Sequence, residues 1–239
     1  MIFNVMRGVF LNMMEILSIN IGRPMKLGYR GKELYTSLFK SRVNRDIYLG
    51  KTNFEGDSQA DLVHHGGEDK AVCVYSNEHY PYWEEKLNRQ LTYGAFGENL
   101  TVNGMLETDI CIGDIMRVGE AIVQVSQPRQ PCYKLARRYN IDDLPVKIQE
   151  TGYTGFYMRV LQEGIVTTSP VIEIMEKDQN GITIDFANQV MHHDKTNLKK
   201  IEMILKIDAL SKSWRATFTK RLNGIETDTK ERLLGKDSL

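Results

Sequence analysis

The residues around Cys132 have the types and spacing that a reactive thiol requires. Cys132 follows the polar segment SQPRQP at 126–131, and cations stand nearby at Arg129, Lys134, Arg137 and Arg138. Two prolines fix the backbone φ on either side of Arg129, so this segment loses little entropy in holding one shape. Cations near a thiol favour the thiolate, which is both the nucleophile and the metal ligand. We therefore predict that a rigid loop presents Cys132 for catalysis or for metal binding.

The other two cysteines have a different setting. Cys73 and Cys111 each lie in a strand-like apolar stretch, where a free cysteine is most often a buried core residue. Three cysteines are an odd number, and no CxxC pair is present, which argues for a reducing compartment and against a disulfide framework. We predict a cytoplasmic protein in which Cys73 and Cys111 are structural.

Two histidine pairs are weaker candidates. Adjacent histidines on an extended chain point apart, and tetrahedral zinc would need further ligands at recognisable spacing. The pair His64-His65 precedes Gly66-Gly67, which is either a nest of backbone N–H groups for an anion or a plain turn. The second pair, at 192–193, is predicted to be a solvated helix end.

Composition narrows the classes of function. The 239 residues are 41% hydrophobic and 26% charged with a net charge of zero, so no global field points to nucleic acid or to a membrane. No Walker A, GxGxxG or Ser/His/Asp pattern supports nucleotide or hydrolase chemistry. Residues 195–239 hold 11 Lys/Arg against 6 Asp/Glu, and Arg215, Lys220 and Arg221 give the last helix a basic face. That face is a solvated surface, a nucleic-acid surface or a docking surface for an acidic partner.

Short strands separated by turn residues organise most of the chain. Strand patterns at 16–21, 71–75, 110–125, 152–160 and 171–175 favour an antiparallel barrel over parallel βαβ units. After Gly181 the apolar spacing becomes helical, with Thr183 and Ser211 or Ser213 as helix caps. We predict a β-barrel domain over 15–181 and a three-helix domain over 182–239. Residues 1–14 are predicted to be an extension from a misassigned start, the alternative being a strand or helix that packs on the domain.

Four motifs resemble the MOSC domain family, the C-terminal domain of molybdenum-cofactor sulfurases. They are HHGG at 64–67, FGENL at 96–100, GD at 113–114 and SQPRQPCYK at 126–134. Their order and spacing, with SKSW at 211–214, are most similar to the YiiM-like branch, and the resemblance covers nearly everything from Glu15 onwards. It implies a mainly β fold, an antiparallel barrel of the pyruvate-kinase-barrel-like type, with a small C-terminal three-helix domain.

The resemblance also implies a molybdenum cofactor, Mo-molybdopterin, with Cys132 as the catalytic residue and metal ligand. Arg129 and Lys134 would offset the charge of its phosphate or dithiolene, as would the backbone around His65, Gly66 and Gly67. Asn99 would hydrogen-bond the pterin or orient its loop.

The YiiM-like members reduce N-hydroxylated compounds, and the resemblance implies this activity for hydroxylaminopurine-type base analogues, hydroxylamines and amidoximes, a detoxification. Electrons would come from a separate flavin-containing reductase, because the chain has no nicotinamide or flavin motif of its own. The alternative is a non-catalytic module that carries the cofactor, or a persulfide on Cys132, for another protein. We expect no nucleic-acid or membrane partner, and whether the chain forms a homodimer is left open.

Overall fold

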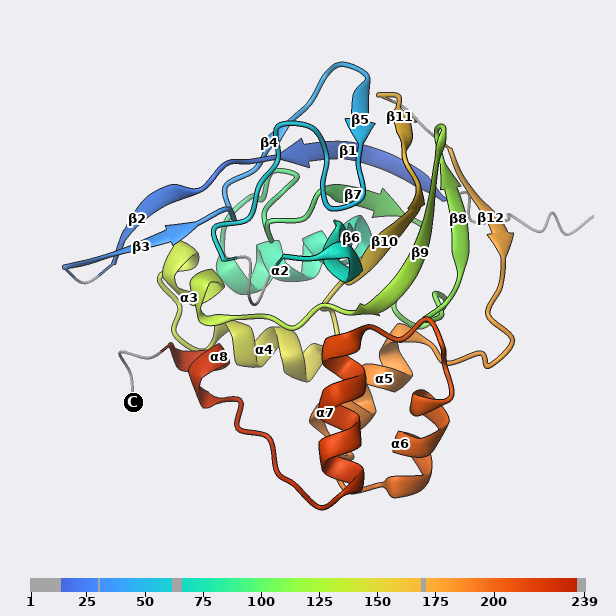
Figure 1. Cartoon of the computed structure of the whole chain (residues 1–239). Coiled ribbons are helices and arrows are strands. Elements are labelled where there is room, and N and C mark those ends of the chain that lie inside the picture. The colour runs from blue at the N-terminus through green and yellow to red at the C-terminus, as the bar shows by residue number, and fades with distance from the viewer. Residues whose placement is uncertain (1–13, 30, 62–65, 169–170, 236–239) are drawn as a thin grey trace, which may run out of the picture.

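The computed structural model describes residues 14–29, 31–61, 66–168 and 171–235 (Figure 1). All but the last residue of the predicted N-terminal extension lies outside this range, and so do His64 and His65. Within the described residues, no helix is long and apolar enough to cross a membrane.

One large curled sheet forms the body of the molecule. Its strand order is β12-β8-β9-β10-β6-β7-β1-β4, and its described pairs are antiparallel except for the parallel pair β6–β7. A bridge between Glu15 and Val171 brings β1 and β12 together across the open side of the curl. The mainly antiparallel, barrel-like sheet predicted from the sequence is confirmed. Its strands are β1 (Glu15–Ile21), β4 (Ser41–Arg42), β6 (Val72–Ser76), β7 (Leu100–Asn103), β8 (Ile115–Val118), β9 (Ala121–Pro128), β10 (Phe156–Gln162) and β12 (Ile172–Glu176).

Two smaller pairs of strands complete the β structure. The hairpin of β2 (Met25–Tyr29) and β3 (Lys32–Thr36) projects from the body at the left of Figure 1. The strands β5 (Ile47–Leu49) and β11 (Gly164–Val166) pair above the curl.

Helices cover the lower side of the sheet in Figure 1. In the C-terminal part, Thr183, Asn197 and Ser211 cap three helices by accepting from the backbone N–H three residues later. The predicted caps Thr183 and Ser211 are thus confirmed. The helical elements are η1 (Glu68–Lys70), η2 (Asn77–His79), α2 (Tyr80–Leu87), α3 (Tyr133–Tyr139), α4 (Leu144–Thr151), α5 (Ile184–His192), α6 (Leu198–Leu205), α7 (Lys212–Leu222) and α8 (Lys230–Leu234).

The hydrophobic core is continuous from the sheet into the C-terminal helices. One buried cluster joins Val123 and Val125 of β9 with Ile201, Trp214 and Phe218 of α6 and α7. A second cluster fills the space among α2, α3 and α4. The three helices α5 to α7, called the helical unit below, are therefore packed on the sheet rather than tethered to it.

Candidate cofactor pocket

A cavity opens where β6, the end of β9 and the start of α3 meet. Asn99, Arg129, Cys132 and Lys134, predicted as binding residues far apart in sequence, all line it. Gly66 and Gly67 are not among its lining residues, and His65 lies outside the described part of the chain. The lining residues are Thr36, Ser37, Leu38, Lys40, Gln59, Ala60, Asp61, Lys70, Cys73, Gly97, Asn99, Arg129, Gln130, Cys132, Lys134 and Tyr157.

Cys132 occupies the N-cap position of α3, with an extended backbone. The predicted polar loop is shorter than expected, because β9 continues to Pro128 and leaves three residues before the cysteine. Cys132 is only 7% exposed, so the cavity, rather than the outer surface, is where its thiol can be reached.

Arg129 is a buried cation of the cavity wall whose guanidinium is only partly hydrogen-bonded. Its Nη2 donates to the carbonyl oxygen of Phe96 at 2.5 Å, while its Nη1 is buried without a hydrogen-bond partner among the described residues. Burial lowers the pKa of Arg129, but the neighbouring Cys73, Tyr157 and Cys132 outweigh burial and raise it. A buried unsatisfied N–H of a charged group is costly, so this side chain is suited to an anion in the cavity.

Two lysines that sequence reasoning missed, Lys40 and Lys70, join Arg129 and Lys134 in the wall. Lys40 Nζ lies 2.5 Å from the buried Asp57 carboxylate, and Lys134 Nζ lies 3.9 Å from Asp61 Oδ2. Burial lowers the pKa of Lys70, against the opposing effects of Asp69 and Asp61. Among the described lining residues, four are cations and one, Asp61, is a carboxylate, which favours an anionic ligand.

The side-chain amide of Asn99 makes hydrogen bonds to other parts of the protein. Its Oδ1 accepts from the backbone N–H of Cys73 at 3.1 Å, and its Nδ2 donates to Asp57 Oδ2 at 2.9 Å and to the Asn20 carbonyl oxygen at 3.2 Å. Of the two predicted roles, this geometry favours orienting the loop.

The rest of the FGENL motif builds the turn beside the cavity. Glu98 is fully buried and accepts from the N–H groups of Gly94 and Phe96 and from the Thr101 hydroxyl. Gly97 has φ +79°, and a Cβ there would lie 2.6 Å from Leu38 Cδ2. Only glycine fits, because the turn needs both the left-handed backbone and the close approach of the 36–40 segment.

Cys73, predicted to be structural, lines the same cavity as Cys132. Burial raises the pKa of Cys73 to about 11, with Arg129 opposing, so at neutral pH this thiol is protonated. Cys111 is half-buried, forms an isolated β-bridge with Thr183, and does not line the cavity.

Arg137 and Arg138, which follow Cys132 in sequence, do not line the cavity and have other partners. The Arg137 guanidinium lies 4.3 Å from the centre of the Tyr29 ring. Arg138 donates to the carbonyl oxygens of Leu38 and Gly94, which joins the 36–40 wall of the cavity to the FGENL turn. These two arginines support the cavity from outside.

The donor groups of the cavity decide between a metal held by protein side chains alone and a molybdenum cofactor. Among the described residues, no group of three or more His, Cys, Asp or Glu side chains could hold a metal ion. Two thiols, of which Cys73 is protonated, lie beside four cations, one of them Arg129 with its unsatisfied guanidinium N–H. This set fits a ligand that brings its own metal and negative charge. The residues present therefore fit the molybdenum cofactor.

Comparison with known proteins agrees with the motifs. A model of the MOSC domain matches residues 61–173, and a model of the YiiM-like, 3-alpha helix domain matches residues 182–224. The uncharacterized protein YflK of Bacillus subtilis (strain 168) is 53% identical over 207 residues, which are 87% of this chain and 94% of YflK. Protein YiiM of Escherichia coli (strain K12) is 37% identical over 205 residues, 84% of this chain and 91% of YiiM.

Two further similarities extend the comparison. The crystal structure of YiiM from Geobacillus stearothermophilus superposes with a TM-score of 0.75 at 42% identity, covering 87% of this chain and 99% of that one. A protein named Reductase from Gibberella moniliformis (strain M3125 / FGSC 7600) is 32% identical over 166 residues, 68% of this chain but 29% of its own length.

Fold and matches together define the class, a MOSC domain followed by a YiiM-like helical domain. Within that class, the chain belongs to the YiiM-like branch of the MOSC domain family, as its motifs predicted.

Proposed function

We propose that this protein is a molybdenum-cofactor-dependent reductase of small N-hydroxylated compounds. The observation that carries the proposal is the cavity in which Cys132 lies beside Arg129, Lys134, Lys70 and Lys40. Membership of the MOSC family supports the cofactor, and the relative named Reductase supports redox chemistry.

The chain's own residues would bind and orient the cofactor. The Cys132 sulfur would occupy one coordination position of the metal, as a thiolate suits molybdenum. Arg129 Nη1, with Lys134 and Lys70, would neutralise the phosphate and dithiolene. When bound, the cofactor would supply two-electron redox chemistry.

The proposed reaction converts R–NHOH, two electrons and two protons into R–NH₂ and water. The N–O bond breaks, an N–H bond forms, and the oxygen leaves as water. The substrate classes are hydroxylaminopurine-type base analogues, hydroxylamines and amidoximes. The electrons come from a separate flavin-containing reductase, since the chain has no flavin or nicotinamide motif.

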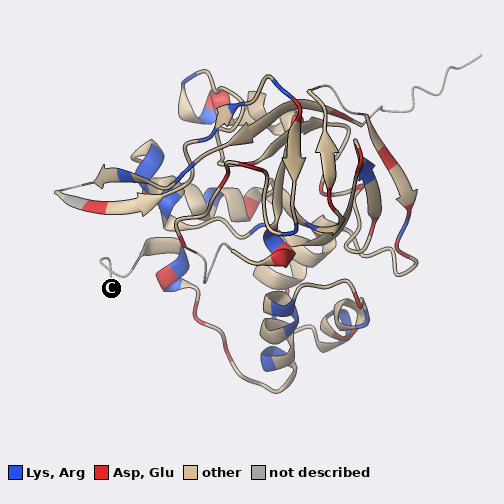
Figure 2. Ribbon diagram, turned by 45° about the horizontal axis from the view of Figure 1, so that its top comes forward, with Lys and Arg blue, Asp and Glu red and all other residues tan. Residues whose placement is uncertain are grey.

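The docking surface for that reductase is proposed on the helical unit, with a change in the residues involved. Arg215 and Arg221, predicted as part of a basic face, donate to carbonyl oxygens at the ends of α6 and α5. Lys220 is exposed on α7, a helix on which Figure 2 shows several basic positions in blue, and it is the residue of the predicted trio most open to a partner. Lys220→Glu should slow turnover with the flavoprotein at low salt but leave turnover with a small artificial reductant unchanged. Equal rates with the flavoprotein at low salt would contradict this docking surface.

The function is tested by turnover. The protein is made in a host that synthesises the cofactor, and reduction of hydroxylamine, benzamidoxime and 6-hydroxylaminopurine is followed with reduced methyl viologen as donor. We expect amine formation that requires the loaded protein. Molybdenum without any turnover would contradict the reductase and favour the carrier alternative.

A further inference from the structure

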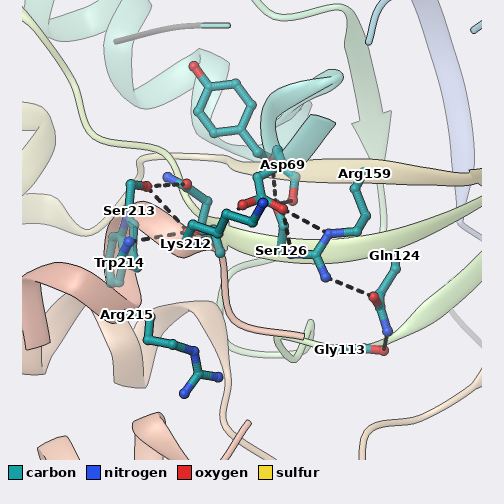
Figure 3. Close-up of polar contacts among 12 residues, drawn as sticks. Asp69, Gly113, Gln124, Ser126, Arg159, Lys212, Ser213, Trp214 and Arg215 are labelled. Carbon is teal, nitrogen blue, oxygen red and sulfur yellow. Dashed lines mark hydrogen bonds and ion pairs between the residues drawn. The ribbon is translucent and has the colours of Figure 1, made fainter. Parts of the chain in front are cut away.

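The carboxylate of Asp69 joins the start of α7 to the turn η1, whose Lys70 lines the cofactor pocket. Asp69 Oδ2 accepts from the backbone N–H of Lys212 at 2.9 Å (Figure 3). Asp69 Oδ1 accepts from Arg159 Nε at 3.0 Å and from Arg159 Nη2 at 2.7 Å. The side chains of Arg159 and Asp69 are 19% and 24% exposed, so solvent screens this charge pair only partly.

Further hydrogen bonds tie the same helix end to β9. The N–H of Ser211 donates to the Ser126 carbonyl oxygen at 3.0 Å, and the Ser213 hydroxyl donates to Gln127 Oε1 at 3.1 Å. The Ser126 hydroxyl in turn donates to the Asp69 carbonyl oxygen at 2.6 Å. The first turn of α7, the 3₁₀ turn η1 and the end of β9 therefore form one bonded junction (Figure 3).

Each barrel segment of this junction continues into the wall of the pocket. Lys70 follows Asp69 directly, and Arg129 comes two residues after Gln127. Arg159 is two residues beyond Tyr157, which also lines the pocket. A shift at the helix end would thus move three lining side chains together.

We infer that Asp69 is a positioning residue that makes the helical unit part of the cofactor site. Its negative charge at the N-terminus of α7 is favourable both for the helix dipole and for the unpaired N–H of the first helical residue. The same carboxylate holds η1 in place, and so fixes where the Lys70 ammonium enters the cavity. The inference rests on the proposed function for the identity of the ligand, but the coupling itself can be measured in cofactor-free protein.

The sharpest variant is Lys212→Pro. Lys212 is the first residue of α7, where proline is favoured, and Ser211 has φ −56° and ψ 150°, which suits a residue before proline. The substitution removes the N–H that Asp69 accepts, and its ring displaces the carboxylate. Lys212→Ala is the matched control, because it removes the side chain and keeps the N–H. Asp69→Ala and the double variant complete a mutant cycle.

Hydrogen exchange of the cofactor-free full chain is the readout. In Lys212→Pro and in Asp69→Ala, amides in peptides covering 67–71 and 127–131 should exchange about tenfold faster, the effect of losing a charge-assisted hydrogen bond. Amides in the interior of α6 and α7 should keep wild-type rates, and so should all peptides of Lys212→Ala. The double variant should exchange no faster than Asp69→Ala alone, because Asp69→Ala already removes the bond to the Lys212 N–H.

Three results would overturn the inference. Wild-type exchange at 67–71 and 127–131 in Lys212→Pro would show that the pocket is insensitive to the helix end, whatever the result for Asp69→Ala, because that variant also loses the Arg159 pair. Faster exchange spread evenly over helices and barrel would indicate general destabilisation. An effect of Lys212→Ala equal to that of proline would assign the role to the lysine side chain. None of these depends on turnover, so a failed reductase assay would leave the outcome readable.

Discussion

Three thiols in one chain illustrate how surroundings decide what a cysteine can do. Cys132 and Cys73 line one cavity and share the neighbouring charge of Arg129, whereas Cys111 lies outside it. Burial raises the pKa of Cys73 to about 11, which makes it a poor nucleophile at neutral pH. The proposed function therefore gives the chemistry to Cys132, with Cys73 as a neutral residue of the cavity wall.

The three cysteines should respond differently to substitution by serine. Cys132→Ser should abolish turnover with methyl viologen, because the metal ligand is lost, while the far-ultraviolet circular dichroism stays unchanged. Cys111→Ser should keep turnover within about twofold, as expected for a site away from reacting atoms. Cys73→Ser should give an intermediate loss. Full activity of folded Cys132→Ser together with loss in Cys111→Ser would reverse the assignment.

Sequence reasoning found those site residues that stand near one another in the chain or in a recognisable motif. Arg129, Cys132 and Lys134 fall in six consecutive positions, and Asn99 lies in FGENL. Lys40, Lys70 and Cys73 were missed because long-range strand pairing brings them to the cavity. Cys73 lies opposite Tyr157 across the β6–β10 pair, a register that local pattern does not specify.

At the scale of elements, arginines hold the helical unit together at its helix ends. Arg215 donates to the carbonyl oxygen of Leu205, the last residue of α6, at 2.7 Å and to that of Ile207, just after α6, at 2.5 Å. Arg221 donates to the Met191 carbonyl oxygen of α5 at 2.9 Å. Cations at C-terminal carbonyls satisfy groups that the helix leaves unpaired.

Arg215→Met should therefore lower the free energy of unfolding by about 1–3 kcal/mol, the cost of leaving such acceptors without a charged donor. The exposed Lys220→Met on the same helix is the control and should change it by less than about 0.5 kcal/mol. Urea denaturation measures both. Equal, small effects would mean that Arg215 is an ordinary solvated cation.

His192 makes the stability of the helical unit depend on pH. The prediction of a solvated histidine pair is wrong for this residue, because the helix end is packed and His192 is 7% exposed. Burial, helped by Arg232, His193 and Arg221, lowers its pKa to about 2. The unfolded chain takes up a proton below about pH 6.5 and the folded chain does not, so stability falls as the pH drops through that range.

The expected loss from pH 7 to pH 5 is about 2 kcal/mol from this group alone. Denaturation midpoints of wild type and His192→Gln at the two pH values measure it. The variant should lose less by that amount. An identical pH dependence in both proteins would show that His192 titrates normally when folded.

Helices with strong local signals were predictable and those without were not. The first residues of α5 and α7 were indicated by Thr183 and Ser211, whose side chains do cap them. The helix α8 was missed because it spans five residues and depends on tertiary contacts, and α4 was not predicted either. Arg232 of α8 makes such contacts, since it donates to the Pro131 carbonyl oxygen and to Gln149 Oε1.

At the scale of the whole molecule, the shared core predicts one cooperative unit. Trp214 of α7 belongs to the cluster that includes the sheet, and Trp83 of α2 belongs to the second cluster. The two tryptophans are the only ones in the chain, so each reports on one cluster when the other is replaced.

Trp83→Phe and Trp214→Phe should show urea transitions by fluorescence that coincide with circular dichroism, as a two-state unit requires. The volume change in each case is modest, so both variants should fold. A Trp214 fluorescence transition that comes well before the circular dichroism transition would contradict the shared core and the coupling through Asp69.

The most direct test of the central claim is the molybdenum content of purified wild type and Cys132→Ser, made side by side in a host that synthesises the cofactor. Cys111→Ser serves as the matched control. The account predicts near-stoichiometric molybdenum in wild type and Cys111→Ser, and a large loss in Cys132→Ser with its fold intact. Equal molybdenum in all three proteins, or none in wild type, would contradict it.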